Sequence, residues 1–407
     1  MIDLFSGTTV VAQALAKSGF RVTTVDAMSY TSSFATALLS VGRGADDFDE
    51  EAILGALHPR AAPSRVSTAF EHWLAAEAEA LKNRDSDALF DVSLDVPQVW
   101  RPEGADGRQR QLFDEAVERR GQTAFDFGAV ISTHYAGTYF GVAQAVELDR
   151  LRVGIQSLRA SGRVNEWEEA VLLTALLSVA SDCVFSPGKH FAQPHLIRGG
   201  KDLSFLRGRV LQDRGVDVWR LFSQRVTTVL RRAAPAGGGH SVYRSTFESF
   251  LEDSAPLRGA DLIYADPPYT AQQYSRFYHV PETLVTYRAP QLQYVRGQVT
   301  RGLYPDDKFK SRFSSKREAP RAFRDLLDLS KRLGSKLLVS YSGTSSGLTG
   351  NDRMIGFEAL LSLCREQAGA DGVRVYEFDH EYRQFNHRNT AVNGRLDKEY
   401  LILCDRV

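Results

Sequence analysis

The N-terminal segment of the chain predicts a layered fold of strands and helices. An apolar beginning and a turn that contains Gly7 predict a strand, and a helix is expected from this turn to about Gly19. A second apolar run begins at Phe20 and ends in a carboxylate, Asp26. Doubly wound folds use this order of strand, glycine turn, helix, strand and acid to bind a nucleoside-bearing cofactor. An ordinary βαβ unit without a ligand remains the alternative.

The turn contains one glycine where a dinucleotide site would need three. A Gly-x-Gly-x-x-Gly loop lets the backbone approach a pyrophosphate at the start of the helix. The missing glycines count against NAD and not against a nucleoside cofactor that has no pyrophosphate. The carboxylate of Asp26 would hold the ribose hydroxyls of the cofactor.

A second motif, Asp266-Pro267-Pro268-Tyr269, follows the apolar run 262–265. The two prolines fix φ and remove backbone donors, which holds the chain rigid between an acidic and an aromatic side chain. This arrangement suits a flat ring that carries an amino group. Asp266 and the Pro267 carbonyl can accept hydrogen bonds from the amino group, while Tyr269 stacks on the ring. Because the tetrapeptide can occur by chance in a turn, it needs support from the rest of the chain.

Together, these motifs resemble the D12 class of S-adenosylmethionine-dependent DNA adenine-N6 methyltransferases. The N-terminal segment is similar to motif I of that class, Asp-Leu-Phe-x-Gly-x-Gly, with Thr9 in the place of the second glycine. The chain that follows the tetrapeptide also reproduces a residue spacing that is common in the class. This spacing is formed by Tyr274, Tyr278, His279 and Glu282. The aromatic residues of this stretch could equally pack under the sheet.

The resemblance implies the site residues by position. The catalytic residues would be Asp266, Pro267, Pro268 and Tyr269. The cofactor would be held by Asp3, Phe5, Ser6, Gly7, Thr8, Asp26, Ala27 and Asp266. The target adenine would be flipped out of the duplex, and its N6 amino group would receive the methyl group by in-line displacement.

The region between the two motifs has helical composition and no nucleotide-binding signature. Segments 71–82 and 167–181 have helical spacing, and a Pro/Gly-rich break at 233–239 precedes a strand at 241–244. Further strands are expected at 336–342, 373–378 and 399–404. The expected fold class is therefore α/β, a Rossmann-like seven-stranded methyltransferase sheet with one strand reversed at the edge and a large, mainly helical insertion.

These anchors divide the chain into two expected domains. Residues 1–45 and 240–407 would form the S-adenosylmethionine-dependent catalytic domain. Residues 46–239 would form the mainly helical insertion, which the resemblance makes a target-recognition domain. The reversed strand and its neighbour would be joined through residues 382–398.

The segment from Arg296 to Arg321 combines basic and aromatic residues. It holds eight basic residues against three acidic ones, and a loop of this kind could bind phosphates beside an extruded base. A solvated loop is the alternative, and core packing is the alternative for aromatic residues in the insertion. The expected DNA or substrate contacts are Tyr274, Tyr278, His279, Lys189, Tyr139, Lys308, Lys310, Arg312, Lys316 and Arg317.

The composition is that of an ordinary globular protein, with 43% hydrophobic and 25% charged residues and a formal net charge of zero. The apolar runs are too short for a membrane helix, and no signal peptide is evident. Three widely separated cysteines argue for reduced thiols and against a zinc site. These features predict a cytosolic protein that binds neither metal nor membrane, and the family resemblance implies that it acts on DNA in the bacterial cytosol.

The predicted function is site-specific methylation of adenine N6 in double-stranded DNA, in a restriction-modification or phage-defence context. Possible partners are a cognate restriction endonuclease or defence-system subunits. The family's usual segment upstream of motif I has no counterpart before residue 2, so cofactor contacts would come from elsewhere or from an upstream extension. A catalytically impaired DNA-binding subunit and an RNA adenine methyltransferase remain alternatives.

Overall fold

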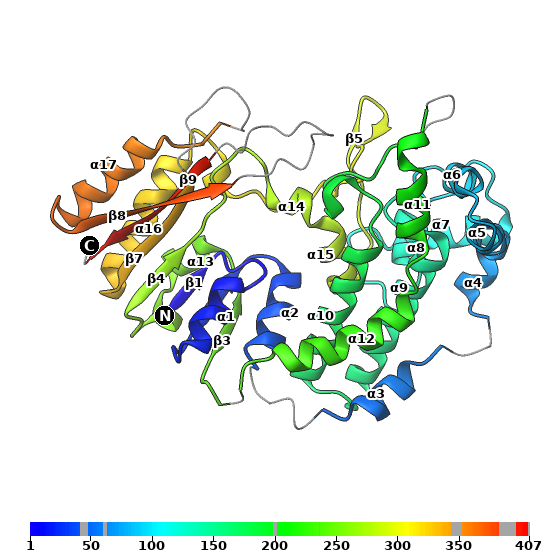
Figure 1. Cartoon of the computed structure of the whole chain (residues 1–407), viewed down its shortest axis with the longest axis horizontal. Helices are drawn as coiled ribbons and strands as arrows, with labels where there is room; N and C mark the ends of the chain where they lie inside the picture. The colour runs from blue at the N-terminus through cyan, green and yellow to red at the C-terminus, as the bar shows by residue number, and fades with distance from the viewer. Residues whose placement is uncertain are drawn as a thin grey trace. The chain divides into compact units, whose positions relative to one another are not determined.

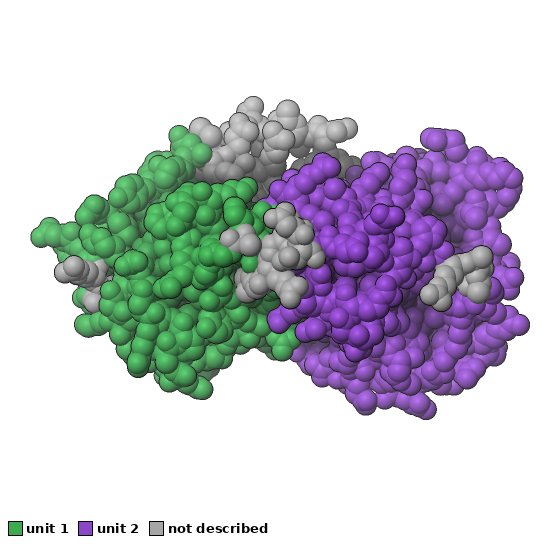
Figure 2. Space-filling view, turned by 90° about the horizontal axis from the view of Figure 1, so that it is seen from below, with its two compact units in different colours: residues 1–44, 233–275, 309–407 green, residues 45–232, 276–308 purple. Residues whose placement is uncertain are grey.

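The computed structural model describes residues 1–40, 48–59, 63–197, 202–235, 237–342, 352–381 and 396–405. The chain divides into two compact units, each assembled from segments that are far apart in sequence (Figure 2). Unit 1 contains Met1–Gly44, Ala233–Ser275 and Phe309–Val407. Unit 2 contains Ala45–Arg232 and Arg276–Lys308.

A seven-stranded sheet forms the centre of unit 1, in the order β3-β2-β1-β4-β7-β9-β8 (Figure 1). Its strands are β1 (Ile2–Leu4), β2 (Thr23–Asp26), β3 (Ser241–Arg244), β4 (Leu262–Ala265), β7 (Lys336–Ser342), β8 (Val373–Glu381) and β9 (Leu396–Cys404). Each neighbouring pair from β3 to β7 is parallel, whereas β9 runs antiparallel to both β7 and β8. The predicted α/β methyltransferase sheet is confirmed. The reversed strand, however, lies between β7 and β8 and not at the edge of the sheet.

Helices cover this sheet on both faces. The helices α16 (Ala319–Leu333) and α17 (Phe357–Ala368) pack on one face, and α1 (Val10–Lys17) and α2 (Ser29–Leu38) on the other (Figure 1). Strand residues that face α16 and α17, such as Ile263, Leu337 and Ile402, have no exposed surface. Burial of these apolar side chains is the main source of stability for the sheet.

The short helix α13 (Phe247–Glu252) begins directly after β3. Its N-cap is Thr246, whose hydroxyl accepts a hydrogen bond from the backbone N–H of Ser249 at 3.3 Å. Phe247 and Phe250 are buried in the same core as the central strands. The aromatic spacing of this segment therefore follows from packing, and Thr246 has a capping role.

Unit 2 is mainly helical, as its sequence predicts. Its helices are α3 (Glu50–Leu57), α4 (Arg65–Ala69), α5 (Glu71–Lys82), α6 (Ser86–Asp95), α7 (Gly107–Glu118), α8 (Val130–Tyr135), α9 (Val142–Ala160), α10 (Glu166–Cys183), α11 (Arg207–Arg214), α12 (Val218–Arg232) and α15 (His279–Thr286). The buried α10 packs against α9 and α12, and its apolar residues form much of the core. A capping box between Asn165 and Glu168 fixes where α10 begins. None of the described helices has the length and apolar character needed to span a bilayer.

Segment Arg276–Lys308 packs within unit 2, whereas the sequence division assigned it to the catalytic domain. It contains α15 and a small hairpin of β5 (Tyr294–Val295) and β6 (Gln298–Val299). The Tyr287 side chain of this segment is fully buried, and its hydroxyl donates to Asp149 Oδ1 at 2.5 Å. Long-range contacts of this kind leave no local signal in the sequence, so the division predicted from the sequence differs here from the compact units.

Candidate functional site

Three carboxylates of unit 1 gather where neighbouring strands end. Asp3 lies in β1, Asp26 is the last residue of β2, and Asp266 follows β4 directly. Because β1 pairs in parallel with both β2 and β4, the carboxyl ends of all three strands lie at one edge of the sheet. The sheet thereby brings the N-terminal motif and the Asp-Pro-Pro-Tyr tetrapeptide together.

The turn after β1 is bonded to the end of β2. The backbone N–H groups of Phe5 and Ser6 donate to the Val25 carbonyl at 2.9 and 3.1 Å. The N–H of Gly7 donates to Asp26 Oδ2 at 3.0 Å. The turn and the acid therefore hold each other in place, which explains why a carboxylate is needed at the end of β2.

Three residues of this turn have left-handed backbone conformations. The φ angles are 68° at Phe5, 49° at Gly7 and 62° at Thr9. Glycine adopts such angles freely, whereas for Phe5 and Thr9 they cost on the order of 1 kcal/mol or more. Thr9 thus has the backbone conformation that the second glycine of the motif would adopt without strain. Strained backbone of this kind is concentrated at functional sites.

Asp26 uses both carboxylate oxygens within the turn. Oδ1 accepts the N–H of Met28 at 2.9 Å, and Oδ2 accepts the N–H of Gly7. Burial raises the pKa of Asp26, and these N–H groups oppose the rise. The N–H of Ala27 and the Thr31 hydroxyl oppose the rise as well, so the acceptor positions of this carboxylate are largely occupied within its surroundings.

Asp3 is the most deeply buried of the three acids, with 1% of its surface exposed. Burial raises its pKa to about 7; a backbone hydrogen bond from Ala12 opposes the shift, and the nearby Asp266 and Asp26 add to it. Among the described residues, Asp3 Oδ2 has no hydrogen-bond partner. A buried acceptor without a partner is costly in a folded protein, and it marks a place for a ligand that donates hydrogen bonds or carries positive charge.

Asp266 and Tyr269 frame the tetrapeptide, with Pro267 and Pro268 buried between them. Burial raises the pKa of Asp266 to about 6; Glu399 in β9 adds to this rise, and the Ser340 hydroxyl opposes it. The Asp266 side chain keeps access to solvent, which moderates the effect of burial. Sequence reasoning missed Ser340 and Glu399 because they reach the tetrapeptide only through the pairing of β4, β7 and β9.

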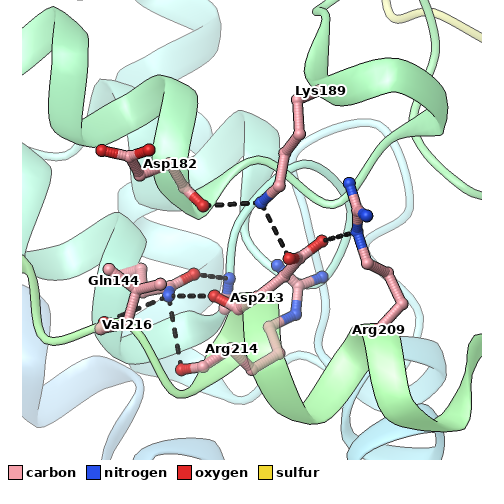
Figure 3. Close-up of polar contacts among 8 residues, drawn as sticks. Gln144, Asp182, Lys189, Arg209, Asp213, Arg214 and Val216 are labelled. Atoms are coloured by element: carbon pink, nitrogen blue, oxygen red, sulfur yellow. Dashed lines mark hydrogen bonds and ion pairs between the residues drawn. The ribbon is translucent and has the colours of Figure 1, made fainter.

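Lys189, predicted as a DNA or substrate contact, is engaged within unit 2 (Figure 3). Its Nζ donates to the Asp182 carbonyl at 2.6 Å and lies 2.8 Å from Asp213 Oδ1. Arg209 approaches the other oxygen of Asp213 at 2.9 Å, and Asp213 itself has no exposed surface. Removal of Lys189 would leave part of a buried charge uncompensated. The structure therefore gives Lys189 a structural role in unit 2, and its contact with DNA stays a prediction.

Tyr139 and His279 are core residues of unit 2, which corrects their prediction as DNA contacts. Tyr139 has no exposed surface, and its hydroxyl lies within donating distance of the Phe191 and Gly302 carbonyls, at 2.8 and 2.9 Å. Burial lowers the pKa of His279 to about 4. A neutral ring that donates from Nδ1 to the Arg276 carbonyl at 3.0 Å orients this segment.

The two tyrosines predicted near the base differ in exposure. Tyr274 belongs to unit 1, begins α14 (Tyr274–Phe277) and is 52% exposed. Tyr278 belongs to unit 2 and is half-buried, and burial raises the pKa of its hydroxyl. Tyr274 therefore remains available for contact with a ligand at the surface of unit 1.

The predicted basic contacts differ in how they are engaged. Lys308 donates to Gln293 Oε1 at 2.9 Å, and Arg312 pairs with Asp325 at 2.7 Å. Lys310, Lys316 and Arg317 are exposed; Lys316 pairs with Asp352 at 2.9 Å and Arg317 with Glu318 at 3.2 Å. Exposed pairs of this kind contribute little stability, so these cations can exchange their partners for phosphates.

Comparison with known proteins agrees with this geometry. Residues 234–327 match the family of D12 class N6 adenine-specific DNA methyltransferases. This stretch of the chain is similar to a D12-class methyltransferase domain. The match includes β3, β4 and the tetrapeptide, so the resemblance drawn from the motifs is confirmed.

Several methylases are also similar to this chain. Modification methylase LlaI of Lactococcus lactis subsp. lactis is 24% identical over 71% of this chain and 42% of its own length. Type II methyltransferase M.FokI of Planomicrobium okeanokoites is 26% identical over 62% of this chain and 33% of its own. Modification methylase StsI of Streptococcus sanguinis is 23% identical over 63% and 33%. The chain thus spans less than half the length of these relatives, and no solved structure matches it significantly.

Proposed function

We propose that the protein transfers a methyl group from S-adenosylmethionine to the N6 amino group of adenine in double-stranded DNA. The observation that carries this proposal is the meeting of the tetrapeptide with the strained turn and its buried, unpaired carboxylate oxygen at one edge of the sheet. The activity would belong to a restriction-modification or phage-defence system of the bacterial cytosol. Candidate partners are a cognate restriction endonuclease or defence-system subunits.

The residues at the strand ends fit the cofactor. S-adenosylmethionine, when bound, supplies a methyl group activated by a positively charged sulfonium. The acids Asp3, Asp26 and Asp266 make this edge of the sheet negative, which suits a cationic ligand. Asp26 would exchange some of its present hydrogen bonds for ribose hydroxyls, and the unpaired Oδ2 of Asp3 suits a donor on the cofactor.

The tetrapeptide would hold the flipped base. Asp266 and the Pro267 carbonyl accept the two amino hydrogens, while Tyr269 stacks on the ring. Fixing the amino nitrogen in this way directs its lone pair at the methyl group and stabilises the positive charge that develops on N6. With its raised pKa, Asp266 can also take up the proton that N6 releases.

The DNA itself would be held by exposed cations on both units. Lys310, Lys316 and Arg317 lie in unit 1, and Arg296 lies in unit 2. We assign the helical unit 2 the role of target recognition, because most of it lies in the chain between the N-terminal motif and the tetrapeptide. Most contacts of this kind reach phosphates and position the duplex.

The test is mass spectrometry of nucleosides after incubation with S-adenosylmethionine and duplex DNA of mixed sequence. We expect N6-methyladenine from the parent and none from Asp266→Ala, which should still bind cofactor by calorimetry. Methylation by Asp266→Ala near the parent rate would refute the assignment. RNA incubated in parallel separates an RNA methyltransferase from a DNA enzyme. If the parent neither methylates nucleic acid nor binds the cofactor, an impaired DNA-binding subunit is favoured.

A further inference from the structure

The Arg353 side chain contacts the ring of Tyr269 in unit 1. Its guanidinium carbon lies 4.7 Å from the centroid of the Tyr269 ring, where the face of the ring attracts a cation. The guanidinium also bonds to the end of β7: Nε donates to the Ser342 carbonyl at 3.1 Å, and Nη2 donates to the Ser342 hydroxyl at 2.7 Å. It is therefore fixed between a strand of the sheet and the ring.

The backbone beside Arg353 is bonded to the same loop. Arg353 forms an antiparallel bridge with Thr270, and the N–H of Met354 donates to the Tyr269 carbonyl at 3.0 Å. The ring of Tyr341 meets that of Tyr269 in an edge contact, with centroids 5.6 Å apart. Tyr269 is thus held through its backbone, through one ring face and through an edge contact.

We propose that Arg353 is a positioning residue that fixes the Tyr269 ring in the orientation in which it stacks on the target base. This inference rests on the proposed function, because it assigns Tyr269 to a flipped adenine. A ring that is already held loses less conformational entropy when the base binds. The amino group of the base is then held more precisely in the orientation that the reaction needs. Arg353 itself touches neither the base nor the cofactor in this assignment.

Arginine suits this role better than lysine. A planar guanidinium can donate two hydrogen bonds to Ser342 in its own plane while its flat face lies over Tyr269. A lysine ammonium keeps the positive charge but cannot reproduce this geometry. Arg353→Lys should therefore retain part of the methylation rate. Arg353→Met, whose side chain has a similar length and no charge, should retain the smallest part of it.

The kinetic test compares these variants on a duplex that the parent methylates. We expect Arg353→Met to lower kcat about tenfold, equivalent to about 1.4 kcal/mol, with an unchanged KM for S-adenosylmethionine. Arg353→Lys should recover part of the rate. The matched control is Arg332→Met, because the Arg332 guanidinium also bonds backbone carbonyls, those of Leu251 at 2.7 Å and Phe250 at 3.5 Å, but on α16. The control should keep the parent rate.

A double-mutant cycle with Tyr269→Leu shows whether Arg353 acts through the ring. In the Tyr269→Leu background, Arg353→Met should change the single-turnover rate no further. An equal loss in both backgrounds, or a parent-like or faster rate for Arg353→Met, would overturn the proposal.

The same cycle measured by denaturant unfolding needs no activity. A coupling of about threefold in the unfolding equilibrium is expected if the cation and the ring interact. If the parent forms no N6-methyladenine, the proposed function fails, and this unfolding cycle still decides whether Arg353 holds Tyr269. Zero coupling would overturn the positioning role even in an active enzyme.

Discussion

Asp3, Asp26 and Asp266 form the strand-end cluster, and Asp3 is the member in which the stability cost of a buried carboxylate is clearest. Its side chain is buried and one oxygen lacks a partner among the described residues. With its folded pKa raised to about 7 from the ordinary value of 3.8, the native state binds a proton more tightly than the unfolded chain. The fold is therefore destabilised as pH rises from about 4 to 7, and the penalty stays constant above that range.

We predict that Asp3→Asn raises the free energy of unfolding by about 2 kcal/mol at pH 8, because the buried charge is removed. The gain should be much smaller near pH 5. Cofactor affinity should fall at the same time, because a neutral amide replaces the carboxylate that faces a cationic ligand. Urea unfolding at the two pH values measures the first effect, and calorimetry measures the second. A variant less stable than the parent at pH 8 would contradict this account.

At the same scale, the sequence predicts residues whose role depends on local order and misses those that depend on pairing. Asp26 and the tetrapeptide stand at strand ends that apolar runs mark clearly. Glu399 is brought to Asp266 only by the register of the last strand. Lys189 resembled a free basic side chain in the sequence, because its partner Asp213 lies on a separate helix.

Among the elements, the hairpin of β5 and β6 has a rigid base and an exposed tip. Its turn, Arg296-Gly297, has φ angles of 52° and 78°, both positive as in a type I′ turn. Tyr294 and Val295 are 52% and 53% exposed. At the base, Tyr304 is buried and its hydroxyl donates to the Ala192 carbonyl at 2.7 Å. An apolar and basic tip on such a base suits contact with a nucleic acid.

We predict that Arg296→Ala weakens binding to duplex DNA about three- to tenfold at low salt and reduces the slope of log affinity against log salt by about one. Fluorescence anisotropy with a labelled duplex at several salt concentrations measures both quantities. The control is Arg163→Ala, an exposed arginine in the turn between α9 and α10 of the same unit. Equal affinities for parent and Arg296→Ala would exclude the hairpin tip from the DNA contact.

This hairpin also shows how far elements can be predicted. The seven strands of the sheet were predicted from apolar runs and the residues that bound them, and α5 and α10 from their helical spacing, whereas α9 and α12 were not predicted. β5 and β6 have two residues each, too few for a periodic signal. The assignment of Arg276–Lys308 to unit 2 depends on the buried contacts of Tyr287 and Tyr304. No local sequence pattern predicts these contacts.

For the whole molecule, the division of the chain into two units predicts that a bound cofactor slows hydrogen exchange in unit 1 and not in unit 2. All residues assigned to the cofactor lie in unit 1, although the chain passes into unit 2 between its segments. A ligand that binds only the native state slows opening of the structure that holds it. S-adenosylhomocysteine should therefore slow hydrogen exchange in segments 2–9, 23–28 and 262–270, and leave α10 in unit 2 unchanged. Asp26→Ala should lose this protection, whereas Arg163→Ala should keep it. Protection centred on α10 would instead place the cofactor in unit 2 and overturn the assignment of the strand-end cluster.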